Sequence, residues 1–244
     1  MALADWTLTN DGLNGYTSVS GGDSGVTWPA VGAFDPNDFL DGDIPKDLAI
    51  NGSRCLTMAA SGGSSLATGH AFRAHTAIRG RMDALVRVNG AYSVPMHCGL
   101  CVLQSQATLL PGGGGVAYAV TLDTILGQQL VRLVQLTNGI QGSPGGAIPT
   151  DYMVLAESPA ARFTPGLVQG LTLAWDADPL VLHGTRLRVG FQDVATPFVW
   201  LWDIVHTGLT AQTPVSPVGV GCFLSYGTNT IVTYFDEITV AGAP

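Results

Sequence analysis

The segment IVTYFDEITV, Ile231–Val240, has the alternating pattern of a β-strand and carries two adjacent acids. On a regular strand, successive side chains point to opposite faces of the sheet. One face then carries Val232, Tyr234, Asp236, Ile238 and Val240, and the other carries Ile231, Thr233, Phe235, Glu237 and Thr239. Asp236 therefore falls in the more apolar row, which raises three alternatives: a catalytic pair, a metal ligand or a structural latch.

The predicted orientation of the two acids decides among these alternatives. Asp236 and Glu237 point to opposite faces of a regular strand, so they cannot act as two carboxylates on one bond. A buried carboxylate without partners is strongly unfavourable, so Asp236 needs two or more hydrogen-bond donors around it. We therefore predict that Asp236 is a structural latch.

The composition favours β structure with many turns. Of the 244 residues, 46% are hydrophobic and only 11% are charged, with 32 Gly and 14 Pro. The only lysine is Lys46 and the only glutamates are Glu157 and Glu237, so residues that favour exposed helices are scarce. This length is compatible with a single all-β domain.

Further alternating segments predict the other strands. The apolar rows are Met82/Ala84/Val86/Val88, Val116/Tyr118/Val120/Leu122, Leu171/Leu173/Trp175, Leu187/Val189/Phe191, Phe198/Trp200/Trp202 and Val218/Val220/Cys222/Leu224. Gly- and Pro-rich turns separate them, which indicates two antiparallel sheets packed face to face. We expect one domain, in which residues 66–244 form the sandwich and residues 1–65 form a loop-rich arm or first strands.

The distribution of charge excludes some partners. The formal net charge is −8, and the arginines are scattered along the sequence, which argues against nucleic acid as a partner. No apolar run is long enough for a membrane span. The N-terminal segment MALADWTLTNDG has neither the basic region nor the apolar core of a secretory signal, so none is expected.

The C-terminal part of the chain resembles the concanavalin A-like (laminin G-like) jelly rolls. The resemblance runs from about Leu167 to Val240 and rests on LTLAWD, GTRLRV, VGVG and FDEITV in that order. It implies an all-β sandwich of the jelly-roll type, with an acid on the last strand that accepts hydrogen bonds or holds a structural cation. Domains with this fold bind glycans, hydrolyse them, or serve as adhesion and coat modules, so the fold alone does not decide the function.

No motif in the sequence indicates catalysis, and we expect no enzymatic activity. Glucanases of the resembling superfamily carry E-x-D-x-(x)-E on one strand, and this pattern is missing here. GGDSG, residues 21–25, is interpreted as a turn. Cys98 and Cys101 in HCGLC would point to opposite faces of a strand, so we expect buried, free thiols.

Two sets of residues are weaker candidates for binding. The acidic loop FDPNDFLDGD offers oxygen ligands of the kind that calcium prefers, although its spacing does not match an EF-hand. Its candidate calcium ligands are Asp35, Asn37, Asp38, Asp41 and Asp43. Trp6, Tyr16 and Trp28 are candidates for contacts with a partner or a glycan, whereas Trp200 and Trp202 are expected in the core.

These observations lead to two hypotheses of different classes. The first is a non-enzymatic structural or adhesion component of a tailed-bacteriophage particle, such as a capsid decoration protein or a tail or fibre module. It implies a virion location after assembly in the host cytoplasm, other virion proteins as partners, and a homo-oligomer such as a trimer. The alternative is a carbohydrate-binding, lectin-like module, and a glycan-active enzyme ranks below both.

Overall fold

The alternating segments of the sequence form the strands of an antiparallel sandwich. The computed structural model describes residues 7–10, 16–21, 56–61, 67–90, 96–103, 117–125, 127–136, 152–176, 184–206, 219–226 and 231–243. The strands within these residues are β1 (Thr7–Asn10), β2 (Tyr16–Gly21), β3 (Leu56–Ser61), β4 (Ala67–Ala74), β5 (Arg79–Gly90), β6 (Met96–Leu103), β7 (Ala117–Ile125), β8 (Gln128–Leu136), β9 (Tyr152–Glu157), β10 (Val168–Asp176), β11 (Thr185–Gln192), β12 (Val199–His206), β13 (Gly219–Tyr226) and β14 (Ile231–Ala243).

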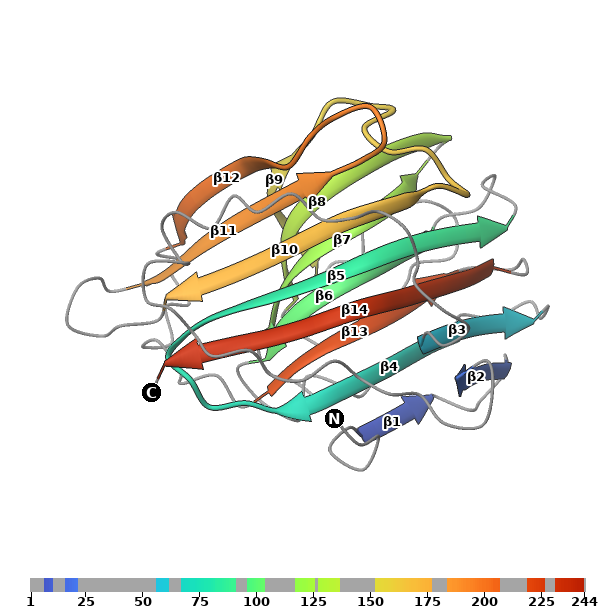
Figure 1. The fold of residues 1–244 in the computed structure, drawn as a ribbon, viewed down its shortest axis with the longest axis horizontal. Coiled ribbons are helices and arrows are strands. Elements are labelled where there is room, and N and C mark those ends of the chain that lie inside the picture. The colour runs from blue at the N-terminus through green and yellow to red at the C-terminus, as the bar shows by residue number, and fades with distance from the viewer. Residues whose placement is uncertain are drawn as a thin grey trace.

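The strands lie in two layers, one in front of the other in Figure 1. Sheet A has the order β1-β4-β13-β6-β7-β8-β9, and sheet B has the order β12-β11-β10-β5-β14-β3-β2. Strands from the first 65 residues pair within both layers: β1 joins β4 in sheet A, and β2 and β3 join sheet B beside β14. The expected all-β, two-sheet architecture is confirmed.

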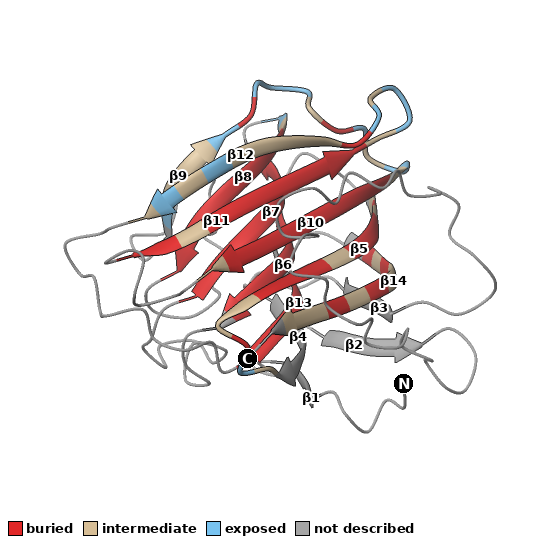
Figure 2. Cartoon of the chain, turned by 60° about the vertical axis from the view of Figure 1, so that its left-hand side comes forward, coloured by how far each residue is buried: buried red, intermediate tan, exposed pale blue. Residues whose placement is uncertain are grey.

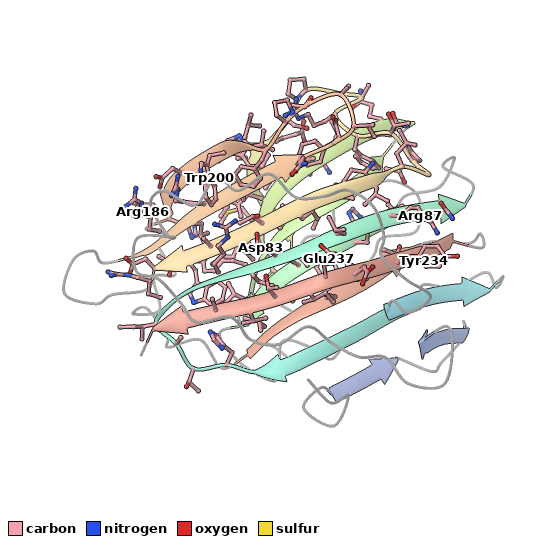
Figure 3. The ribbon with its side chains drawn as sticks, in the orientation of Figure 1. Asp83, Arg87, Arg186, Trp200, Tyr234 and Glu237 are labelled. Atoms are coloured by element: carbon pink, nitrogen blue, oxygen red, sulfur yellow. The ribbon has the colours of Figure 1, made fainter. Side chains whose placement is uncertain are left out.

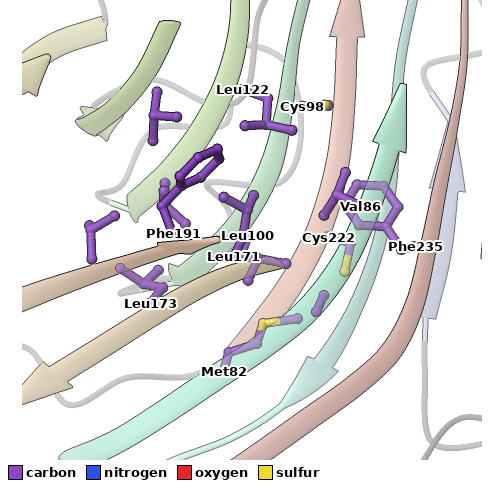
Figure 4. Close-up of a cluster of buried hydrophobic side chains, with 14 of the residues drawn as sticks. Met82, Val86, Cys98, Leu100, Leu122, Leu171, Leu173, Phe191, Cys222 and Phe235 are labelled. Atoms are coloured by element: carbon purple, nitrogen blue, oxygen red, sulfur yellow. The ribbon is translucent and has the colours of Figure 1, made fainter. Parts of the chain in front are cut away.

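The core fills the space between the sheets with the side chains of the predicted apolar rows. Its members include Met82, Val86, Cys98, Leu100, Leu122, Leu171, Leu173, Phe191, Cys222 and Phe235 (Figure 4). On β5, Met82 and Val86 point inward while Arg81 and Asp83 face away, as the alternation predicts. Figure 2 shows that the buried residues run along most of β10 and β11. Burial of these side chains, about 1.5–3 kcal/mol for each large one, dominates the stability of the fold.

Strand β14 does not alternate regularly, which corrects the prediction for its two acids. Asp236 pairs with Leu85 and Thr239 pairs with Asp83, so the register shifts between them. Phe235 before the shift and Ile238 after it are both buried. Two residues, Asp236 and Glu237, therefore lie between consecutive inward side chains, where a regular strand has one. Glu237 has a φ of 46°, a left-handed conformation typical of a β-bulge. The two acids therefore do not lie on opposite faces.

A second bulge corrects the face assigned to the tryptophans of β12. Val189 pairs with Trp202 and the next residue, Gly190, pairs with Trp200, so Leu201 is the extra residue on β12. Trp202 packs against the core, as expected. Trp200 instead contacts arginines on the outer face of sheet B, away from the core. The prediction that both tryptophans share one face is wrong because the bulge reverses the alternation.

The three described cysteines are free and buried. Cys98 and Cys222 belong to the core between the sheets, whereas Cys101 packs into a small apolar cluster with Phe223 and Val134. Cys98 and Cys101 therefore do point to opposite faces of β6. Burial raises the pKa of all three thiols, that of Cys101 to about 12. Such thiols stay protonated and act as small apolar side chains.

Candidate functional site

Five of the nine arginines of the chain lie on the outer face of sheet B. We call these residues the arginine face: Arg79, Arg81 and Arg87 of β5, and Arg186 and Arg188 of β11. They are scattered in sequence, but β10 lies between β5 and β11 and pairs with both. These five arginines are far apart in the sequence, but the pairing of the strands brings them onto one face of the sheet.

The pairing register sets these side chains in rows across the sheet. Ala174 of β10 pairs with Arg81 on one side and with Arg188 on the other. Asp176, at the end of β10, pairs with Arg79 and Arg186 in the same way. The small Ala174 leaves room between two long side chains, and Asp176 supplies a negative charge between two positive ones.

Arginines of this face bind the carboxylates of Asp83 and Asp176. Arg81 Nε donates to Asp83 Oδ2 at 2.8 Å, and Asp83 also accepts the hydroxyl proton of Thr172. Arg79 Nε donates to Asp176 Oδ2 at 3.0 Å. These charge-assisted bonds fix both partners and make the face rigid.

An aromatic cluster lies at the β12 end of the face. The guanidinium of Arg188 is 3.8 Å from the centre of the Trp200 ring, and that of Arg81 is 5.5 Å from it. Phe198 meets Trp200 edge-on with 5.3 Å between the ring centres. Gly190 makes room for Phe198, because a Cβ there would lie 2.5 Å from the phenylalanine ring. Trp200 remains only half-buried, so part of the indole stays accessible.

Next to this cluster, Arg186 and Asp203 form a partly exposed ion pair. Arg186 Nε donates to Asp203 Oδ1 at 2.7 Å, and Arg188 Nε lies 3.5 Å from Asp203 Oδ2. The hydrogen bonds from Arg186 lower the pKa of Asp203, and in turn they raise the pKa of Arg186. The pair thus stays charged and offers hydrogen-bond groups of both kinds to solvent.

At the opposite end of the face, Arg87 stacks on Tyr234. The guanidinium carbon of Arg87 is 4.7 Å from the centre of the Tyr234 ring, and the two residues are direct cross-strand partners on β5 and β14. Both side chains are half-buried. Figure 3 shows Arg87 beside Tyr234 at one end of the face, and Trp200 with Arg186 at the other.

The predicted latch, Asp236, lies beside the arginine face on β14. Its Oδ1 accepts the backbone N–H of Glu237 at 2.9 Å, so it caps the bulge. Asp236 is half-buried rather than deeply buried. This bond agrees with a structural role, and that role stays a prediction until the side chain is replaced.

A chain of buried charges crosses the outer face of sheet A. His97 Nδ1 lies 3.1 Å from Asp123 Oδ1, and Arg132 Nη1 lies 3.3 Å from Asp123 Oδ2. Arg132 Nε also donates to Glu157 Oε2 at 2.7 Å. The side chain of Asp123 is 0% exposed and that of His97 is 3% exposed, so a ligand cannot reach them. We therefore interpret this cluster as structural.

A smaller polar cluster lies inside the sandwich near its end. The hydroxyl of Tyr118 is 3.0 Å from His206 Nδ1, and Gln135 Nε2 donates to the same hydroxyl at 3.5 Å. Burial lowers the pKa of His206 and raises that of Tyr118. Both side chains are therefore neutral near pH 7.

The other candidate residues fall where no contact can be assigned. The five candidate calcium ligands, Trp6 and Trp28 lie outside the described residues, and Tyr16 begins β2 without a described side chain. Within the described ranges, no group of three or more His, Cys, Asp and Glu is placed to hold a metal ion. The same ranges contain no helix that is long and apolar enough to span a membrane.

Comparison with known proteins bears on the fold rather than on the family. No protein-family model matches the sequence, and no curated protein matches it. Among solved structures, the chain is similar to an alginate lyase of class PL-14 from Aplysia kurodai, with 10% identity, a TM-score of 0.51, and coverage of 78% of this chain and 84% of that chain. A legume lectin-like domain from Entamoeba histolytica has 8% identity, a TM-score of 0.49, and coverage of 88% and 96%. Lectin II from Ulex europaeus has 12% identity, a TM-score of 0.40, and coverage of 76% and 87%.

The similarity to the alginate lyase agrees with the observed topology. An identity of this size bears on the fold alone and leaves the function open. The chain has an all-β fold of two antiparallel sheets, an architecture that it shares with the PL-14 alginate lyase.

Proposed function

We propose that the chain is a lectin-like module that binds carbohydrate on the arginine face and does not cleave it. The observation that carries the proposal is the position of Trp200. The β12 bulge turns this residue out of the core and onto a face rich in fixed charged groups. A half-buried tryptophan on such a face combines an apolar surface with neighbouring polar groups, as carbohydrate sites require.

The groups around Trp200 suit the mixed surface of a sugar. The indole offers apolar area against the C–H groups of a pyranose ring. The neighbouring Arg186–Asp203 pair offers N–H donors and carboxylate acceptors to the hydroxyl groups. Because the pair is already held by its own hydrogen bonds, little side-chain freedom is lost when a ligand binds.

The same pairing argues for binding rather than cleavage. Glycoside hydrolysis needs a carboxylic acid that holds its proton near neutral pH, which requires a raised pKa. The pKa of Asp203 is lowered by Arg186, and Asp83 and Asp176 are each held by an arginine. Each of these three carboxylates is suited to orienting a sugar.

The role in a virus particle stays a prediction, together with the trimer and the virion location. No described contact bears on it, whereas the arrangement around Trp200 supports glycan binding directly. Mass spectrometry of purified particles tests the particle role, and absence of the chain from them rules it out. Glycan binding is also compatible with that role, as recognition of a host receptor.

A glycan array followed by titration calorimetry tests the proposed function. The wild-type chain should bind at least one class of glycan, and Trp200→Ala should weaken its binding about tenfold or more, equivalent to about 1.4 kcal/mol. Met153→Ala is the matched control, because Met153 is 44% exposed on β9 of the other sheet. Unchanged affinity in Trp200→Ala, with a wild-type melting temperature, would contradict the proposal. Release of new reducing ends or unsaturated ends from the bound glycan would contradict the absence of cleavage.

A further inference from the structure

Arg87 differs from the other four members of the arginine face. Arg79, Arg81, Arg186 and Arg188 each lie within 4.0 Å of a carboxylate oxygen. Among the described residues, none provides such a partner for Arg87, whose one recorded contact is the stack on Tyr234. Its Nε is buried and has no acceptor. Arg87 is therefore the member of the arginine face whose charge is not already matched by an ion pair.

A buried guanidinium N–H without an acceptor is unfavourable, so a partner is expected at this position. The stack on Tyr234 holds the guanidinium of Arg87 against the ring. Two parallel N–H groups in one plane match the two oxygens of a carboxylate. Asp236 follows two residues after Tyr234 on β14 and its Oδ1 accepts the N–H of Glu237, and the ion pairs of the described residues do not join it to Arg87.

We infer that Arg87 and Tyr234 form a subsite for the carboxylate of an acidic sugar, a uronic acid. This inference rests on the proposed function, because it assigns part of the glycan that the face would bind. The carboxylate would accept two hydrogen bonds from Arg87. Tyr234 would hold the guanidinium in place and supply apolar area beside the sugar ring.

The separation of the two ends of the face sets the size of the ligand. Trp200 is on β12 and Tyr234 is on β14, and three strands lie between these two in the order of sheet B. With about 4.8 Å between neighbouring strands, the two are about 19 Å apart across the sheet; Trp200 is in register with Asp83 and Tyr234 with Arg87, which adds about 14 Å along the strands and gives about 23 Å in all. A ligand that reaches both is therefore an oligosaccharide that runs across the strands, with an acidic unit near Arg87.

The experiment compares an oligogalacturonate of about six units with its methyl ester of the same length, in which each charged carboxylate is replaced by a neutral ester. The wild-type chain should bind the acid at least about tenfold more tightly than the ester. Arg87→Gln should remove this preference by weakening the acid alone, and Arg87→Lys should keep part of it because Lys retains the charge without the planar fork. Trp200→Ala should weaken both ligands and leave their ratio unchanged.

The outcomes separate the two proposals. If the wild-type chain binds both oligosaccharides equally, or if Arg87→Gln keeps the wild-type ratio, the acidic subsite is wrong and glycan binding stands. If the chain binds neither of them but binds neutral glycans on the array, the acidic subsite is also wrong. If it binds no glycan at all, the proposed function fails. Melting temperatures of all variants must match the wild type for these comparisons, and Tyr234→Phe serves as a second variant that retains the stacking ring.

Discussion

Replacement of Arg132 by Met tests whether the buried charges on sheet A hold that part of the fold together. Arg132 lies between Asp123, which is fully buried, and Glu157, whose side chain is 43% exposed. Met replaces the aliphatic stem of Arg without its charged end, so Arg132→Met removes the interaction and keeps much of the apolar packing. Asp123 then remains buried and loses the positive charge of Arg132.

The expected loss follows from the geometry. Opposite charges 3.3 Å apart attract by about 5 kcal/mol at an effective dielectric constant of about 20. Removal of one member of a buried pair typically destabilises a protein by about 3–5 kcal/mol. We expect a loss in this range, which lowers the urea midpoint by about 1–1.7 M if the m-value is about 3 kcal/mol/M.

Urea unfolding of a double-mutant cycle measures this contribution. Asp123→Asn removes the buried negative charge, so the double variant Arg132→Met/Asp123→Asn should be more stable than the sum of the two single losses predicts, by about 2 kcal/mol. Arg132→Lys is the control, since it keeps the charge and should lose less than Met. Strict additivity, or a loss below about 1 kcal/mol for Arg132→Met, would refute the reasoning.

Four further outcomes are expected. Burial lowers the pKa of His206 below 6.5, so the folded state resists protonation and stability falls as the pH drops below 6.5; melting curves at about pH 7.5 and about pH 5 should show a smaller loss in His206→Gln. Because burial raises the pKa of Cys101 and the other two described thiols, iodoacetamide should label them only after unfolding, and peptide mapping that finds labelled native Cys101 would disprove this. Gly99→Ala would place a Cβ 1.9 Å from the carbonyl oxygen of Val120 and should cost about 3 kcal/mol or more, whereas Gly127→Ala meets nothing within 4 Å and should cost about 1 kcal/mol for its positive φ; equal urea midpoints would contradict this. Asp236→Ala should lower stability by about 1–2 kcal/mol through loss of the bond to Glu237 N–H and leave glycan affinity unchanged, so an unaltered melting temperature would refute the latch.

Alternation along the sequence predicts the sandwich well where strands are regular. On β10, Leu171, Leu173 and Trp175 are predicted to share a buried face, and all three belong to the core. The order of motifs from about Leu167 to Val240 also gives the jelly-roll type. These features are local or nearly so, which is why a single sequence reveals them.

The candidate site depends on features that alternation does not reveal. Both bulges occur at residues without a turn signal, since Leu201 and Glu237 are neither Gly, Pro, Asn nor Asp. Trp200 was therefore expected in the core. The arginine face arises because β10 pairs with both β5 and β11, and the partners of a strand are set by the whole topology rather than by local pattern.

The bulge at Glu237 changes which residues of β14 face the core. Regular alternation from the inward Phe235 would place Glu237 and Thr239 on the core side. Because of the bulge, Ile238 and Val240 face the core instead. If β14 kept all its residues and lost the bulge, regular alternation from Phe235 would turn those two apolar side chains away from the core. Deletion of Glu237, in contrast, would leave Phe235, Ile238 and Val240 at alternate positions of a regular strand, so all three should still face the core.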